Sequence, residues 1–175
     1  MKKFLLLCSI AISSAIYAQE FEITQEGILE KGTNKDFVII KSDGKSAKEL
    51  YNSTVKHIGK INGKVLEDEK YEHLKWQVYV PKITYVEELL TKNYIDAYIT
   101  IQLSFKDNRA KYEITATNFK CPSNGKNLVI RAAGMTDPSY FIYRRNGNLV
   151  ETRAKSDIED FFKRDIKSIL EQDNW

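Results

Sequence analysis

Residues that could supply catalytic or metal-binding chemistry are few in this sequence and lie far apart. The two histidines are His57 and His73, and neither belongs to an HExxH or His-x-His motif. A metal site would therefore have to be assembled from distant carboxylates. The acidic runs Glu67-Asp68-Glu69 and Glu87-Glu88 are typical of solvated faces, the alternative being catalytic carboxylates or calcium ligands. We predict no metal, no cofactor and no catalytic residue.

The nucleophiles also lack a supporting context. The sequence contains no GxSxG motif, P-loop or Rossmann fingerprint. The cysteines are Cys8 and Cys121, and Cys8 falls in a predicted export segment, so a disulfide within one mature chain is excluded. Because no histidine lies near Cys121 in the sequence, we expect an inert free thiol there. The alternative is an intermolecular disulfide in an oxidising compartment.

Aromatic side chains point to a binding surface instead of a reaction centre. The chain has ten tyrosines, and we predict that Trp76, Tyr79, Tyr94 and Tyr98 lie on or near one surface of a sheet. Tyrosine and tryptophan are common at interfaces because they combine a large apolar area with a polar group. The alternative is that these rings pack under the long loops or under a helix.

The amino terminus has the pattern of an export signal. Met1-Lys2-Lys3 is a short basic segment, Phe4–Ile16 is apolar, and Tyr17-Ala18-Gln19 resembles a cleavage site after Ala18. The apolar run is shorter than the roughly 20 residues of a transmembrane helix. We therefore expect a signal peptide at 1–18, a single domain at 19–175 without a transmembrane segment, and a location in the periplasm, at the cell surface or outside the cell.

The charge of the predicted mature chain is close to neutral. The whole sequence has 27 basic and 24 acidic residues. Cleavage after Ala18 removes Lys2 and Lys3 and no acidic residue, which leaves 25 against 24, or about +1. A nucleic-acid-binding protein usually carries a basic stripe. Export and near-neutrality together argue against a nucleic-acid partner.

One predicted hairpin, Tyr94–Phe119, organises the rest of the chain. Apolar residues occupy every second position, the signature of strands with one buried face. They are Ile95, Ala97, Ile99, Ile101, Leu103 and Phe105 before the turn Lys106–Arg109, and Ala110, Tyr112, Ile114 and Ala116 after it. This hairpin predicts the centre of an antiparallel sheet.

Further elements are predicted on both sides of this hairpin. Asp36–Lys41 is apolar and β-branched and predicts a strand, whereas Val65–Glu72 is charged and predicts a loop. Lys75–Val80 alternates, but Pro81 cannot donate to a ladder, so the strand should be an edge or end there. Glu87–Lys92 predicts a short helical turn or loop.

Two helices are predicted, each with a serine that could cap it. Ser46-Ala47-Lys48-Glu49 and Ser156-Asp157-Ile158-Glu159 both fit a capping box. Leu149–Thr152 predicts a strand after the Asn146-Gly147 turn. The sum is an α+β fold: a twisted, mostly antiparallel sheet of about six strands, with two amphipathic helices on one face.

The helix entry Lys45–Tyr51, the turn Phe105–Tyr112 and the signal ending in Ala18-Gln19 carry a family resemblance. The chain resembles an uncharacterised family of exported bacterial proteins, the domain of unknown function 4468 family, over roughly residues 35–119. The family usually has glycine where Asn108 stands, and asparagine tolerates the left-handed backbone. The resemblance implies a TATA-binding-protein-like fold. It does not imply DNA binding, because function belongs to a site and not to a fold.

These observations favour an exported, non-enzymatic binding or interaction module whose partner is an unknown protein or small molecule. Two alternatives remain open. One is a carrier that holds a small apolar ligand between helices and sheet. The other is a hydrolase with unrecognised carboxylates.

Overall fold

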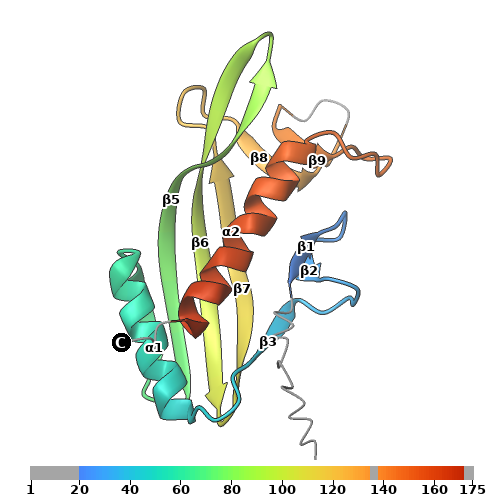
Figure 1. Ribbon diagram of the computed structural model, residues 1–175. Helices are drawn as coiled ribbons and strands as arrows, with labels where there is room; N and C mark the ends of the chain where they lie inside the picture. The colour runs from blue at the N-terminus through green and yellow to red at the C-terminus, as the bar shows by residue number, and fades with distance from the viewer. Residues whose placement is uncertain (1–19, 135–137, 172–175) are drawn as a thin grey trace, which may run out of the picture.

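The computed structural model describes residues 20–134 and 138–171, which form a seven-stranded sheet, a small two-stranded sheet and two helices (Figure 1). The order in the large sheet is β4 (Lys64–Glu69), β5 (His73–Glu88), β6 (Thr91–Lys106), β7 (Arg109–Lys120), β8 (Asn127–Arg131) and β9 (Tyr140–Tyr143), with β3 (Phe37–Lys41) also paired to β7. β1 (Phe21–Ile23) pairs with β2 (Ile28–Glu30). Only β8 and β9 pair in parallel among these strands. The α+β class and the mostly antiparallel sheet are confirmed. The predicted signal peptide lies outside the described residues.

The central hairpin is confirmed as β6 and β7, with one change on β7. Ile95, Ile99 and Leu103 are fully buried, as the alternation predicted. A bulge at Thr115 then shifts the register, because Ile101 pairs with Ile114 and Thr100 pairs with Ala116. An extra residue reverses the facing of the side chains that follow it. The prediction that Ala116 is buried is therefore wrong, and Ala116 is exposed.

The turn between β6 and β7 contains the asparagine at which the chain differs from the resembled family. Asn108 has a positive φ of 65°, a conformation that asparagine adopts more readily than most residues. Its side-chain oxygen also accepts a hydrogen bond of 2.8 Å from the Gly44 backbone N–H. This contact joins the turn to the segment that leads into the first helix.

β5 is longer than predicted because a bulge accommodates Pro81. Val80 pairs with Ala97 and Thr84 pairs with Ile95, so Pro81–Ile83 stand outside the ladder. A proline needs no ladder partner there, and the strand continues to Glu88. Glu87–Lys92 was predicted as a helical turn or loop, and this prediction is wrong. The segment forms the end of the β5–β6 hairpin.

The charged stretch after the first helix is a strand and not the predicted loop. β4 occupies Lys64–Glu69 at one edge of the sheet, and all its residues are exposed. Charged side chains on an edge strand oppose pairing with other chains. The charges that suggested a loop are therefore compatible with a strand at this edge.

The first helix begins as predicted, and the second does not. In α1 (Ala47–Lys60), Ser46 Oγ accepts from the Glu49 N–H, and Glu49 accepts from the Ser46 N–H at 2.7 Å. α2 (Thr152–Leu170) starts a turn before Ser156, and its N-cap residue makes no side-chain cap. The second capping box and the strand Leu149–Thr152 are wrong, since packing of Ala154 extends the helix toward its N-terminus.

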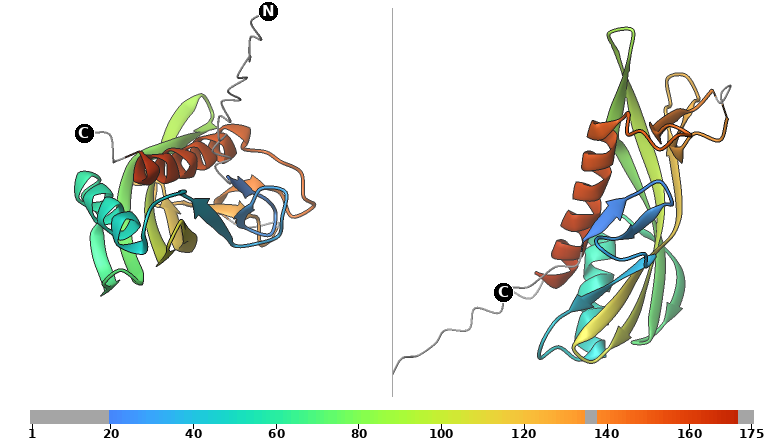
Figure 2. Two further views of the ribbon diagram at one scale, coloured as in Figure 1. Left: turned by 60° about the horizontal axis from the view of Figure 1, so that its bottom comes forward. Right: turned by 90° about the vertical axis from the view of Figure 1, so that its right-hand side faces the viewer.

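Both helices pack on the apolar face of the sheet. α1 contacts β6 and β7, α2 contacts β5, and the helices contact each other. The ring of Tyr51 on α1 lies 5.7 Å from that of Phe105, and Tyr112 of β7 donates a hydrogen bond to Asp165 on α2. Figure 2 (right) shows α2 lying along one side of the sheet. The helices leave the other face of β5 and β6 open.

Candidate functional site

The open face of the sheet carries a pair of tyrosines whose rings are in contact at a tilt of 37°. Tyr79 on β5 pairs in register with Tyr98 on β6, and their ring centroids lie 5.0 Å apart. Tyr79 is 48% exposed and Tyr98 is 46% exposed. Aromatic rings in such cross-strand pairs interact favourably. Half of each ring nevertheless remains available to another molecule.

A second tyrosine pair lies further along the same hairpin. Tyr85 pairs with Tyr94, with ring centroids 5.8 Å apart. The Lys92 ammonium lies 4.6 Å from the centre of the Tyr85 ring, and the Lys82 ammonium lies 5.2 Å from that of Tyr94. These cation–π contacts place positive charge directly on the aromatic surface.

Asp96 lies between the two tyrosine pairs and holds Tyr79 and the Lys82 backbone in place by hydrogen bonds. Its carboxylate accepts a hydrogen bond of 2.5 Å from the Tyr79 hydroxyl and one of 2.9 Å from the Lys82 backbone N–H. The hydrogen bond to Asp96 raises the pKa of Tyr79 above its ordinary value. A shallow hollow of about 300 Å³ opens here, bordered by Tyr79, Tyr94, Asp96 and the two lysines, together with Pro81, Pro122 and Ser123. The Tyr79, Tyr94 and Tyr98 part of the predicted surface is thus one continuous region, which we call the tyrosine face.

Trp76 does not belong to the tyrosine face, and its prediction is wrong. It is fully buried on the helix side, with its ring 6.4 Å from that of Tyr112. Trp76 and Tyr79 are three residues apart in a strand without a bulge between them, so they point to opposite faces. Among the described atoms its indole N–H has no hydrogen-bond partner.

A buried polar group between the helices was missed by the sequence analysis. His57 Nε2 lies 2.7 Å from Asp165 Oδ1, and His57 Nδ1 lies 3.1 Å from Ser168 Oγ. The other Asp165 oxygen accepts a hydrogen bond of 2.7 Å from the Tyr112 hydroxyl. Burial, reinforced by the Asp165 carboxylate, raises the pKa of Tyr112 well above its ordinary value. The sequence signal for the burial of His57 is its helical spacing from the buried residues Leu50 and Thr54.

The acidic runs that were considered as ligands make ordinary surface pairs. Glu67 contacts Lys75 at 2.8 Å and His73 at 3.4 Å, and the hydrogen bond from Lys75 lowers its pKa. Glu88 accepts hydrogen bonds from Tyr140 and Lys126, and these lower its pKa. Within residues 20–134 and 138–171, no group of three or more His, Cys, Asp or Glu side chains is placed to hold a metal ion.

Cys121 is a free, fully buried cysteine whose sulfur lies 3.1 Å from Ser123 Oγ. In this fold the thiol is out of reach of a second chain, which favours the inert thiol over the intermolecular disulfide. In the described part of the chain, no helix has the length and apolar character needed to cross a membrane.

Comparisons with known proteins identify the fold. No family model and no curated relative matches the chain. A solved structure of a DUF4468 family protein from Bacteroides ovatus is similar, with a TM-score of 0.52 and 11% identity over 77% of this chain and 84% of that one. A TBP-like protein from Parabacteroides distasonis is also similar, with a TM-score of 0.50 and 12% identity over 77% and 91%. These neighbours match the resemblance seen in the sequence, and they confirm that this chain has a TATA-binding-protein-like α+β fold.

Proposed function

We propose that this protein is a non-enzymatic binding module that holds a partner protein on its tyrosine face. The observation that carries the proposal is the Tyr79–Tyr98 pair, whose rings are in contact and half exposed at the centre of a well-paired sheet. The two helices cover the opposite face and leave this one open. Tyrosine is enriched among residues that dominate binding energy at interfaces.

The energetic demand on three tyrosines is modest. Truncating one interface hot spot costs about 2 kcal/mol or more. A micromolar complex has a binding free energy of about −8 kcal/mol. Tyr79, Tyr94 and Tyr98 would therefore supply a large part of the binding free energy of a transient complex, and Lys82, Lys92 and the neighbouring polar residues would supply the rest.

A protein partner fits this surface better than a small molecule. The hollow beside Asp96 is about 300 Å³, the lower end of the range for small-molecule sites, which are usually more enclosed. Polar residues lie beside the tyrosine pair: Asn118 pairs in register with Tyr98, and Gln77 lies two residues before Tyr79 on β5. Aromatic anchors surrounded by polar groups are typical of interfaces between proteins.

The apolar-carrier hypothesis gains no support from the packing. A carrier would need space between the helices and the sheet. Trp76, Tyr112 and Phe162 are fully buried in that region. Phe21 of β1 packs against both Tyr112 and Phe162, with centroid distances of 5.7 and 5.6 Å.

The hydrolase alternative has a candidate site at Ser168, which differs from the carboxylates considered from the sequence. Ser168, His57 and Asp165 are in hydrogen-bond contact in the order of a catalytic triad. Ser168 borders a hollow of about 290 Å³ with Lys60, Arg164 and Lys167. The hydrolase hypothesis ranks behind the binding module because Ser168 lies within α2. Its backbone N–H is used by the helix and cannot stabilise an oxyanion. Labelling of the wild type by a fluorophosphonate probe, lost in Ser168→Ala, would support it; absence of labelling would exclude it.

We also propose that the module is exported and acts in the periplasm or at the cell surface. The motivation is the basic, apolar and small-residue pattern of residues 1–18. The intact mass of protein recovered from its own cells tests this. A chain that begins at Gln19 supports export, and a chain that retains Lys2 and Lys3 contradicts it.

Photo-crosslinking in living cells tests the binding function. A photoreactive phenylalanine analogue replaces Tyr98, and in a matched control it replaces Val55, an exposed residue on α1. We expect a discrete crosslinked protein from position 98 that is absent from position 55 and is lost when Tyr79→Ser is added. Equal crosslinking at both positions, or none at position 98, would refute a partner at the tyrosine face.

A further inference from the structure

The tip of the β5–β6 hairpin consists of two adjacent, exposed leucines. Leu89 is 94% exposed and Leu90 is fully exposed. They form a two-residue turn between Glu88 and Thr91, which pair with each other. Isolated exposed leucines are common, but a pair with essentially no protein contact is unusual.

The backbone of this turn makes leucine an unfavourable choice. Leu89 has φ = 49° and Leu90 has φ = 66°. Positive φ at both central positions characterises the type I′ hairpin turn, which strongly prefers Asn-Gly. Leucine has no side-chain hydrogen bond that could support a left-handed backbone. Neither folding nor solubility in water favours Leu-Leu at this turn. Such a strained apolar site suggests a role in contacting another molecule.

The tip is also the most prominent part of the hairpin. The distal end of β5 and β6 extends beyond α2 and β8 in Figure 1, and it projects in the same way in the side view of Figure 2. β4 pairs with β5 only as far as Gln77, and β7 pairs with β6 only from Asp96 onward. The end of the hairpin is therefore a narrow two-stranded ribbon with leucines at its point.

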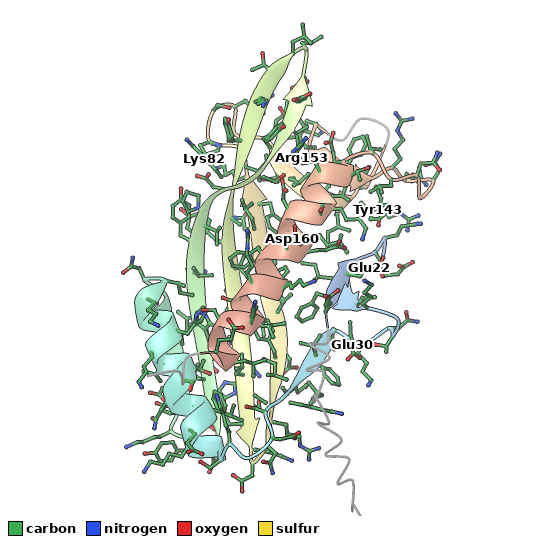
Figure 3. All side chains as sticks on the ribbon, in the orientation of Figure 1. Glu22, Glu30, Lys82, Tyr143, Arg153 and Asp160 are labelled. Atoms are coloured by element: carbon green, nitrogen blue, oxygen red, sulfur yellow. The ribbon has the colours of Figure 1, made fainter. Side chains whose placement is uncertain are left out.

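Tyrosine rings and cationic groups lie behind the leucines. Tyr85 and Tyr94 are each four residues from a leucine of the tip, or about 14 Å along an extended strand. Lys92 and Arg153 lie over the Tyr85 ring at 4.6 and 4.8 Å, and Lys82 lies over the Tyr94 ring. Figure 3 labels Lys82 and Arg153 near the place where the hairpin leaves the body of the sheet.

We propose that Leu89 and Leu90 insert the hairpin tip into the surface of a lipid bilayer. Peripheral membrane anchors bury apolar residues about 5–10 Å into the headgroup and acyl boundary. With the leucines at that depth, Tyr85 and Tyr94 reach the outer headgroup region, where tyrosine and lysine are enriched. A convex apolar point with a belt of tyrosines and cations matches this environment.

The charge around the ribbon is close to balanced. Four cationic side chains, Lys82, Lys92, Lys126 and Arg153, contact the rings or carboxylates of this region. Its carboxylates are Glu87, Glu88, Glu151 and Asp96, which borders the same hollow as Lys82 and Lys92, and Glu88 is paired with Lys126 at 3.1 Å. Apolar insertion therefore supplies the affinity, and the balanced charge adds no net attraction to anionic headgroups. This inference does not depend on a protein partner at the tyrosine face.

The sequence of the turn offers a variant that removes the leucines without weakening the fold. Leu89→Asn with Leu90→Gly introduces the residues that a type I′ turn prefers. The matched control is Leu66→Asn, an exposed leucine at the bulge of β4. Co-sedimentation is measured with vesicles of phosphatidylethanolamine and phosphatidylglycerol, and with vesicles of phosphatidylcholine alone. All proteins are compared in the same processed form, as verified by mass.

We expect the wild type and Leu66→Asn to bind the anionic vesicles equally. The Asn-Gly variant should bind about tenfold or more weakly while its melting temperature stays the same or rises. The wild type should bind phosphatidylcholine vesicles to a similar extent, because the charge around the ribbon is close to balanced. Binding to the anionic vesicles alone would overturn apolar insertion as the source of the affinity. Equal binding by the Asn-Gly variant, or no vesicle binding by the wild type, would overturn the proposal. In the latter case, a protein crosslinked from position 89 in cells would assign the tip to a protein pocket instead.

Discussion

Tyr79 lies directly opposite Tyr98 across β5 and β6, and the centroids of the two tilted rings lie 5.0 Å apart while both residues remain half exposed. Asp96 holds the Tyr79 hydroxyl at 2.5 Å. The pair is therefore preorganised on a rigid part of the sheet, which lowers the entropy cost of ordering these side chains when a partner binds.

Replacing both rings should affect binding much more than folding. For Tyr79→Ser with Tyr98→Ser, we expect the free energy of unfolding to fall by about 1 kcal/mol or less, because cross-strand pairs of this kind contribute about 0.2–1 kcal/mol. Urea denaturation measures this change. A loss of several kcal/mol would mean that the rings are structural.

Trp76, three residues before Tyr79, should behave in the opposite way. Trp76→Ala removes a fully buried ring and should cost about 3–5 kcal/mol in unfolding free energy. Trp76→Phe should cost clearly less, since the indole N–H it removes makes no hydrogen bond to the described residues. A loss for Trp76→Phe as large as that for Trp76→Ala would contradict the expectation that the buried aromatic ring carries most of the stabilisation.

His57 and Asp165 should be energetically coupled. Their 2.7 Å contact is buried between α1 and α2, and removing one partner of such a pair typically costs about 3–5 kcal/mol. We expect His57→Leu and Asp165→Leu each to be strongly destabilising. The double variant should lose less than the sum, with a coupling of about 1–3 kcal/mol. Additive losses would contradict a direct interaction.

Tyr112 should make stability depend on pH in alkaline solution. Its pKa is raised in the folded state by burial and by Asp165, so its contribution is present below the ordinary tyrosine pKa of about 10 and is lost as the pH rises above it. Tyr112→Phe should be destabilising at neutral pH, because Asp165 loses a hydrogen-bond donor. The difference from wild type should then shrink above about pH 10 by up to about 1.4 kcal/mol per pH unit.

The control for this titration is Ile101→Val, a buried substitution without an ionisable group. Its cost of about 0.5–1.5 kcal/mol should stay constant over the same pH range. A constant difference between wild type and Tyr112→Phe would contradict the raised pKa.

Local rules predicted well those elements whose signal lies within a few residues. The alternation from Ile95 to Phe105 gave the correct buried face of β6, and the Ser46–Glu49 capping box gave the correct start of α1. Both signals act through neighbouring backbone and side chains, so they do not depend on distant parts of the chain.

The errors arise where a distant contact or an extra residue decides the outcome. Pro81 lies in a bulge that only the pairing with β6 defines, and Thr115 reverses Ala116 in the same way. His57 meets Asp165 across 108 positions of sequence, which no local pattern reveals. Trp76 is different, because its three-residue spacing from Tyr79 was sufficient to place the two on opposite faces.

The most direct test of the binding function is hydroxyl-radical labelling of the protein in intact cells and after purification. The proposal predicts that Tyr79 and Tyr98 are labelled readily in the purified protein and several-fold less in cells. Val55 and Leu149, which are exposed elsewhere, should be labelled equally in both. Equal labelling of Tyr79 and Tyr98 in cells and after purification would contradict a partner on the tyrosine face.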